Sequence, residues 1–325
     1  MGNSTRRSFL ANTGYSALGV LLWPALKPFV GTTIHPGLNS PAAAEPNLNF
    51  PTQVRERIAI ASYPFRDFVA RTKKQTGGTN KIALKDFAAH TAEKLHIKKI
   101  EPWSEHFLSR DGKYLEEVRA GVEKVGGAIV NIAVDGQHSP YAADKAEREA
   151  SVAFSKQWVD VALAVGSPSI RTNMSKAKDS EPNVERAASS LARVAEYGAS
   201  KNIVVNLEND NPVSEDPFFI VQVLEKVNIP WLHSLPDFAN TLTTGREEHA
   251  YQGIAAMFPH AYNICHVKEM ETNESGRDFH VDMHKTFGIL KSAYYKGYCS
   301  MEFDSAGDPY QGTARLIEIT LREFA

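Results

Sequence analysis

Cysteine is scarce in this sequence, which holds only Cys265 and Cys299 in 325 residues. A small secreted fold held together by several disulfides is therefore excluded. Both cysteines fall in stretches typical of strands, and we expect them to be buried, to point outward toward helices and to remain unbridged. The last expectation assumes that neighbouring parallel strands are staggered by about two residues, which separates the Cα atoms by about 7 Å, the limit for a disulfide.

An excess of positive charge is also missing. The chain has 36 basic and 38 acidic residues, a formal net charge of −2, and no long basic run. Proteins that bind nucleic acid gain most of their non-specific affinity by neutralising phosphates. Nucleic acid is therefore not an expected partner.

The N-terminal apolar run is too short and too interrupted to be a convincing membrane span. It follows the pair Arg6-Arg7 in "MGNSTRRSFLANTGYSALGVLLWPAL", is broken by two glycines and Pro24, and precedes the small residues 42–44. A basic N-terminal segment, an apolar run and small residues at the expected cleavage site predict a twin-arginine signal peptide over residues 1–44 and a periplasmic location. An uncleaved anchor and a soluble protein with a basic tail remain as alternatives.

No Gly-x-Gly-x-x-Gly follows the first expected strand, so an open doubly wound sheet is only the second choice. After a polar linker over residues 45–56, eight strand-like stretches alternate with eight helical ones, and the loop 72–80 is expected to be flexible. Alternation of this kind predicts parallel strands with crossover helices, here a closed (β/α)₈ TIM barrel in the α/β class spanning residues 57–325. The expected strands are 57–65, 97–103, 128–136, 169–174, 203–210, 231–240, 261–270 and 298–305. The expected helices are 82–96, 114–126, 144–166, 183–202, 218–227, 247–258, 284–297 and 311–324.

Four polar residues stand at the carboxyl ends of the last four strands. They are Glu208, Asp237, His266 and Glu302, spaced by 29, 29 and 36 residues, which is one strand–helix unit each time. Barrel active sites lie at this end of the strands. Three carboxylates and an imidazole that converge there would repel one another unless a cation bound between them. An oxygen-rich set with one nitrogen suits one divalent ion: Mn²⁺, Mg²⁺, Co²⁺ or Zn²⁺.

These strand ends resemble those of the xylose isomerase-like barrel superfamily. The similarity rests on "LEND" (207–210), "PDFAN" (236–240), "HVKE" (266–269) and "YKGYCSMEFDSAGDPYQG" (295–312). The resemblance implies that Glu208, Asp237, His266 and Glu302 bind one divalent metal. It also implies that Glu208 and Glu302 act as acid and base on opposite sides of a carbon next to a carbonyl, through an enediolate. Within the superfamily, the sequence most resembles exported members of the sugar phosphate isomerase/epimerase family.

Other residues are candidates for the substrate pocket. Lys268 shares a strand face with His266 and is expected to stabilise a substrate oxyanion or phosphate, or to hold a neighbouring carboxylate. Asn240 departs from the histidine that ketose 3-epimerases and apurinic-site endonucleases of the superfamily often carry there. An endonuclease site with Asp278 and His280 is not expected for that reason. The remaining candidate substrate-binding residues are Glu101, Trp103, His106, Arg171, Asn173 and Arg277.

Three functions remain open. The first is a metal-dependent sugar isomerase or epimerase, and the second is a lyase or dehydratase that expels a substituent from a keto-sugar or 3-keto-glycoside. The third is a sugar-binding barrel without catalysis. The expected partner is a small carbohydrate, no membrane span should remain after signal cleavage, and assembly into a homo-oligomer stays open.

Overall fold

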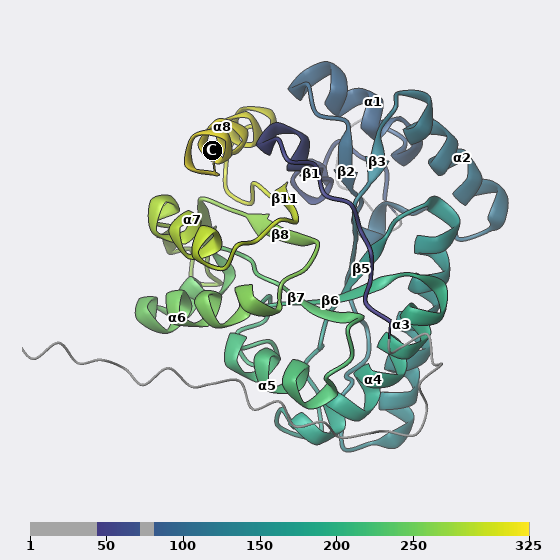
Figure 1. Cartoon of the computed structure of the whole chain (residues 1–325), viewed down its shortest axis with the longest axis vertical. Coiled ribbons are helices and arrows are strands. Elements are labelled where there is room, and N and C mark those ends of the chain that lie inside the picture. Colours follow the sequence, from purple (N-terminus) through teal and green to yellow (C-terminus); the bar gives the residue numbers. More distant parts are fainter. Residues whose placement is uncertain (1–43, 72–80, 325) are drawn as a thin grey trace, which may run out of the picture. The chain divides into compact units, whose positions relative to one another are not determined.

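The structure is a computed structural model that describes residues 44–71 and 81–324. The predicted signal peptide, except for its last residue, and the predicted flexible loop 72–80 lie outside the described residues. Within them, helices surround a ring of strands, and the chain passes once around that ring (Figure 1).

The barrel strands are parallel and form two sheets. One has the order β3-β2-β1-β11-β8 and the other the order β4-β5-β6-β7. The strand bounds are β1 Ile58–Ala61, β2 Lys99–Glu101, β3 Ala128–Ile129, β4 Ile132–Val134, β5 Ser169–Thr172, β6 Val204–Glu208, β7 Leu232–Leu235, β8 Ile264–Val267 and β11 Tyr298–Met301.

Isolated bridges join the two sheets at both seams. Trp103, just beyond β2, pairs with Ala133 of β4, and Asp237, just beyond β7, pairs with His266 of β8. The His266 amide donates to the Pro236 carbonyl at 3.0 Å across the second seam. Because β3 and β4 are the two halves of the expected strand 128–136, the ring has eight strand positions, as a (β/α)₈ barrel requires.

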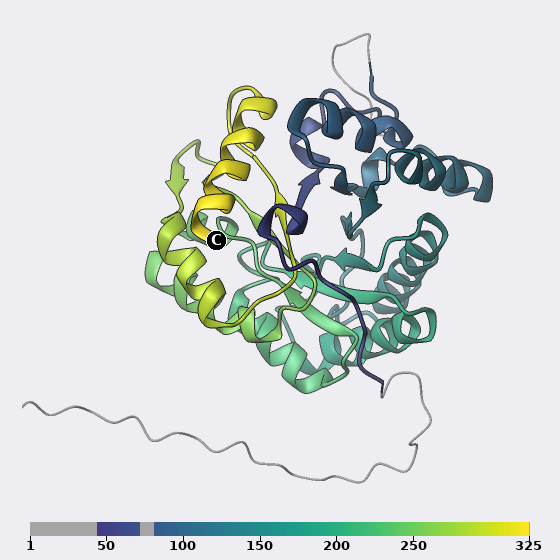
Figure 2. The ribbon, with the colours of Figure 1, turned by 45° about the horizontal axis from the view of Figure 1, so that its top comes forward.

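In the described part of the chain, eight α-helices pack outside the strands. Helix α8 contacts α1, so the helical layer also closes on itself (Figure 2). Five of the helices begin at an Asp or Asn whose side chain accepts a backbone N–H of the first turn: Asp111, Asp144, Asn183, Asp216 and Asp282. The bounds are α1 Leu84–Leu95, α2 Gly112–Lys124, α3 Lys145–Val165, α4 Val184–Lys201, α5 Pro217–Val227, α6 Glu247–Met257, α7 Met283–Ser292 and α8 Pro309–Phe324. None of the helices in the described ranges has the length and apolar character needed to span a membrane.

The main apolar core contains strand residues that are packed with the helices, such as Ile58, Ile100 and Ile170. Cys265 and Cys299 belong to this layer, buried and unbridged as predicted. The expected two-residue stagger is wrong, however, because the two cysteines are direct partners in the register of β8 and β11. Their sulfur atoms lie 3.8 Å apart.

Polar side chains connect strands across the barrel interior. The Asn263 amide donates to Ser169 Oγ at 2.8 Å, and Ser169 Oγ donates to Asn131 Oδ1 at 2.6 Å. Asn131 Nδ2 in turn donates to Glu101 Oε1 at 2.7 Å. Hydrogen-bonded buried polar groups hold a fixed geometry, so this network gives the site above it a rigid base.

A hairpin that the sequence pattern did not predict follows β8. Its strands β9 (Met270–Thr272) and β10 (Asp278–His280) are antiparallel and pair over three residues each. Both strands contact the 3₁₀ turn Asn240–Thr244 that follows β7. The hairpin therefore lies beside the carboxyl ends of the strands, where the candidate ligands are.

Residues 44–56, called here the N-terminal strap, contact the barrel at the opposite end. The Trp231 indole donates to the Ala44 carbonyl at 2.6 Å, and the Tyr262 hydroxyl donates to the Pro46 carbonyl at 2.7 Å. Phe50 packs edge-on against Tyr262 and Tyr298. The segment expected to be a polar linker thus packs against residues at or just before the amino ends of β7, β8 and β11.

Candidate metal centre

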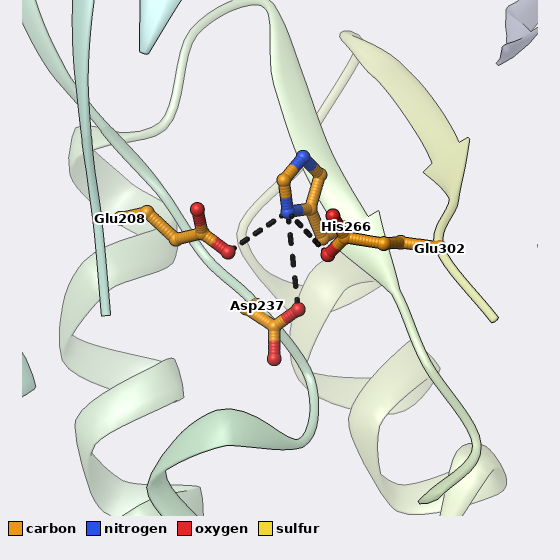
Figure 3. A group of neighbouring side chains, drawn as sticks. All are labelled: Glu208, Asp237, His266 and Glu302. Carbon is orange, nitrogen blue, oxygen red and sulfur yellow. Dashed lines mark hydrogen bonds and ion pairs between the residues drawn. The ribbon is translucent and has the colours of Figure 1, made fainter. Parts of the chain in front are cut away.

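The four predicted ligands meet at one point. Glu208 is the last residue of β6, Asp237 follows β7, His266 lies within β8 and Glu302 follows β11. One ligand atom from each lies within 4.8 Å of the others, and all four residues are buried. Figure 3 shows Glu208 and Glu302 on either side of the imidazole, with Asp237 completing the group. Consecutive strand–helix units bring them together as the spacing predicted.

The imidazole nitrogen Nδ1 faces all three carboxylates. It lies 2.8 Å from Glu208 Oε1, 3.0 Å from Glu302 Oε2 and 3.9 Å from Asp237 Oδ2. Asp237 Oδ1 accepts two backbone N–H groups, whereas its Oδ2 is buried without a hydrogen-bond partner among the described residues. A buried acceptor without a donor is costly. A divalent cation within this cluster would supply the missing partner, so the residues fit a metal site.

Two cations flank the carboxylates. Arg171 Nε lies 2.9 Å from Glu208 Oε2, and its NH1 lies 3.2 Å from Asp135 Oδ1. Lys268 Nζ lies 3.3 Å from Glu302 Oε2 and 3.6 Å from Asp237 Oδ2, and it donates to Asn240 Oδ1 at 2.9 Å. Both cations are therefore already paired with protein groups.

The local charges determine the protonation of the cluster. Burial raises the pKa of Asp237 to about 6, with Glu208 and Glu302 adding to the rise and Lys268 opposing it. Burial acts the same way on Glu302, but His266 and Lys268 outweigh it and hold its pKa well below the usual value. Burial alone would lower the pKa of His266, yet Glu101, Glu302 and Glu208 raise it well above the usual value. The carboxylates thus stabilise the positive charge of the imidazole at the centre of the cluster, as they would stabilise a bound cation.

A pocket of about 270 Å³ opens onto Glu208 and Glu302. Of the predicted residues, Trp103, Arg171, Asn240 and Lys268 also line it. Trp103 is fixed by a 2.7 Å hydrogen bond from its indole to Asp135 Oδ2. Asn240 donates to Glu208 Oε1 at 3.3 Å. Carboxylates, an aromatic ring and hydrogen-bonding side chains thus converge beside the cluster.

A family model described as "Xylose isomerase-like TIM barrel" matches residues 90–322. The chain belongs to this xylose isomerase-like family. No curated protein matches this sequence closely enough to count as a relative.

Solved structures share the fold at low sequence identity. D-allulose 3-epimerase from Methylomonas sp. is 16% identical, with a TM-score of 0.63 over 85% of this chain and 100% of its own. The 3-keto-D-glucoside 4-epimerase from E. coli is 16% identical, with a TM-score of 0.57 over 82% and 98%. A xylose isomerase-like TIM barrel protein from Mycobacterium smegmatis in complex with magnesium is 15% identical, with a TM-score of 0.60 over 83% and 98%.

Four of the predicted substrate-binding residues do not line the pocket. Glu101 lies behind His266, and both of its carboxylate oxygens face the ring nitrogen Nε2. His106 is fully buried behind Trp103, and its Nδ1 lies 2.7 Å from Ser62 Oγ. Asn173 donates to Asp210 Oδ2 at 2.8 Å, and the exposed Arg277 stacks on Phe279 in the hairpin. Glu101 and His106 thus support His266 and Trp103 from behind, whereas Asn173 and Arg277 lie outside the pocket lining.

Five lining residues were not predicted: Tyr63, Asp135, Asp210, Glu271 and Asp304. Asp135 directly follows β4, and Asp304 follows Glu302 by two residues, so their positions at strand ends were a usable signal. Glu271 lies on the unpredicted hairpin, 3.0 Å from Lys268 Nζ. Burial raises the pKa of Glu271 to about 7, although Lys268 opposes the rise.

Proposed function

We propose that this protein is a sugar epimerase or isomerase that depends on a divalent metal and moves a proton at a carbon next to a carbonyl. We also propose that it acts in the periplasm, because residues 1–44 have the pattern of a twin-arginine signal. The convergence of four buried ligand atoms, with Asp237 Oδ2 lacking a hydrogen-bond donor among the described residues, supports the metal dependence most directly.

The solved structures of the same fold favour this reaction class. Three of them are named as D-allulose 3-epimerase, L-ribulose 3-epimerase and 3-keto-D-glucoside 4-epimerase. Because their sequence identity to this chain is only 16–17%, the similarity shows a shared fold. The reaction therefore has to be argued from the residues of this chain.

Glu208, Asp237, His266 Nδ1 and Glu302 would hold the ion. A bound divalent ion supplies the positive charge that polarises a carbonyl and stabilises an enediolate. Arg171 and Asn240 orient Glu208, and Lys268 orients Glu302. Each of the two carboxylates is thereby fixed at its own side of the pocket.

In this proposal Glu208 and Glu302 exchange the proton. Both line the pocket, and they approach His266 Nδ1 from opposite sides (Figure 3). A substrate carbon between them can lose its proton to one carboxylate and receive a proton from the other. This two-sided transfer inverts the carbon, which is the chemistry of an epimerase.

Deuterium exchange tests the proposal. Metal content is first measured by elemental analysis, and about one Mn, Mg, Co or Zn ion per chain is expected. The loaded protein is then incubated in D₂O with ketohexoses and 3-keto-hexosides. Deuterium should enter the carbon next to the carbonyl, and an epimer or isomer should form.

Two variants test the roles, and their metal content is measured beside the exchange rate to separate loss of the ion from loss of the acid or base. Glu302→Gln and Glu208→Gln should each slow the exchange at least about a hundredfold, in the range usual for removing an acid or base. Glu123→Gln, in an exposed ion pair on α2, serves as the control and should exchange at the wild-type rate. A metal-loaded protein that binds a sugar without exchanging any proton would contradict the proposal. Release of a substituent with formation of an enone would indicate the lyase alternative.

A further inference from the structure

A second hollow adjoins the pocket of the metal centre. It has a volume of about 620 Å³ and shares Asp210, Asn240 and Glu271 with the inner pocket of about 270 Å³. The inner pocket alone is slightly smaller than most small-molecule sites, which span roughly 300 to 1,000 Å³. With the outer hollow included, the space extends well beyond the reacting centre.

The outer hollow is lined by groups that bind hydroxyls. Besides the shared residues, its walls consist of Pro212, Thr243, Thr272, Asn273, Glu274 and Ser275. Hydroxyl and amide side chains can donate to and accept from sugar hydroxyls. No lysine or arginine contributes to this wall in the described ranges, and the two cations of the inner pocket are paired with carboxylates. The lining therefore favours an uncharged polyhydroxylated group over a phosphate.

The hairpin wall is held in a defined shape. Asn273 Oδ1 accepts from the amide and hydroxyl of Ser275 and from the Arg277 amide. Gly276 at the turn has φ +79°, a conformation that favours glycine. At its base, Glu271 is tied to Lys268 by the 3.0 Å ion pair. A preorganised wall of this kind lowers the cost of ordering a ligand against it.

We propose that the outer hollow is a subsite for the glycosidic substituent of the substrate. The substrate is then a neutral glycoside: its reacting sugar ring lies at the metal centre, and a second sugar unit lies between Pro212 and the hairpin. This inference rests on the proposed function and narrows its substrate from sugars in general to glycosides.

Binding and exchange, measured side by side, test this assignment. Calorimetry of the metal-loaded protein compares neutral disaccharides of glucose and galactose with the matching methyl glycosides. Proton exchange is followed in parallel on the ketohexoses and 3-keto-hexosides of the first test. The wild-type protein should bind at least one disaccharide tenfold or more tightly than its methyl glycoside.

Two variants fill the outer hollow away from the metal ligands, Pro212→Trp and Glu274→Trp, both at exposed positions. Each should abolish the tenfold preference and leave unchanged the Kd of the methyl glycoside and the proton exchange on ketohexoses, which have no glycosidic substituent to reach the outer hollow. Pro212→Ala and Glu274→Ala change the same residues without filling the space and should keep the preference.

Retained exchange without a preference for the disaccharide overturns the subsite alone. So does a preference that survives both tryptophan variants. A metal-loaded protein that binds no sugar and exchanges no proton overturns the proposed function, and the subsite with it.

Discussion

Glu101 holds the imidazole of His266 from the side opposite the metal cluster. Nε2 of His266 lies 2.9 Å from Glu101 Oε2 and 3.0 Å from Oε1, and Glu101 is 1% exposed. Burial would raise the pKa of Glu101, but the charge and hydrogen bond of His266 lower it overall, so the carboxylate is ionised. An ionised carboxylate only accepts, so Nε2 keeps its proton. Nδ1 is then the nitrogen at which a metal ion would displace the second proton of the charged imidazole.

We predict that Glu101→Gln weakens metal binding about 10- to 100-fold, the usual cost of losing the acceptor behind a histidine ligand. Glutamine keeps the size but replaces one acceptor oxygen with an NH₂ group, which opposes the Nε2 proton. Calorimetric titration of the chelator-treated protein with Mn²⁺ measures the change. Glu117→Gln, in an exposed pair with Lys85, is the matched control. Unchanged affinity in a folded Glu101→Gln protein would show that His266 does not need this partner.

Asp237→Asn should uncouple stability from the metal. In the wild-type protein, Mn²⁺ at 100 times its Kd should stabilise the fold by about 2.7 kcal/mol. The variant should lose this gain, whereas its stability without metal should change little. The asparagine oxygen can accept the same two backbone N–H groups, and Lys268 stays paired with Glu302 and Glu271. Urea unfolding with and without Mn²⁺ measures both effects. A variant that is strongly destabilised without metal would indicate that Asp237 is mainly structural.

His106 should make the fold sensitive to acid. Ser62 Oγ accepts the Trp103 amide proton and lies 2.7 Å from His106 Nδ1, so the buried ring is hydrogen-bonded to a neutral group. Burial lowers the pKa of His106 from 6.5 to about 3. Between these two values the unfolded chain binds a proton that the folded chain does not, so stability falls as the pH falls.

For this residue, the loss between pH 6.5 and 5 is expected to be roughly 1 to 2 kcal/mol. His106→Gln should remove that part of the slope in urea unfolding at several pH values. The exposed His280 provides the control, and His280→Gln should keep the wild-type slope. An identical pH dependence in wild type and His106→Gln would exclude His106 as its source.

Two helical glycines should respond oppositely to alanine. A Cβ at Gly312 of α8 would lie 2.3 Å from the ring of Phe303, next to Glu302, whereas a Cβ at Gly288 of α7 would meet nothing within 4 Å. Gly288→Ala should stabilise the protein by about 0.5 to 1 kcal/mol through helix propensity. Gly312→Ala should destabilise it by about 1 to 3 kcal/mol, since the packed core has to give way. Thermal unfolding of the two variants measures both effects. A Gly312→Ala protein more stable than the wild type would contradict the close packing of α8 against Phe303.

The sequence predicted the strand–helix order and the four ligands because both follow from repetition along the chain. One strand–helix unit separates Glu208 from Asp237 and Asp237 from His266, so each carboxyl end recurs at the same height. The hairpin was missed because β9 and β10 are only three residues long, too short for a periodic pattern.

Depth within the barrel could not be predicted in the same way. Glu101 is the last residue of β2 and was therefore predicted to line the pocket. In the structure it pairs with Ala61 of β1, and the Glu101 side chain lies beneath the imidazole of His266. How far a strand end protrudes depends on the stagger of the whole ring, which no local pattern encodes. The direct pairing of Cys265 with Cys299 was missed for the same reason.

The N-terminal strap covers the end of the barrel opposite the metal centre. Within the described residues, the Ala44 carbonyl accepts the Trp231 indole proton, and further contacts follow at Pro46 and Phe50. A chain that keeps residues 44–56 keeps these contacts. A start at Ile58 would instead leave the Trp231 indole without this acceptor and uncover Tyr262 and Tyr298. Expression of the barrel should therefore retain residues 44–57, upstream of the first strand.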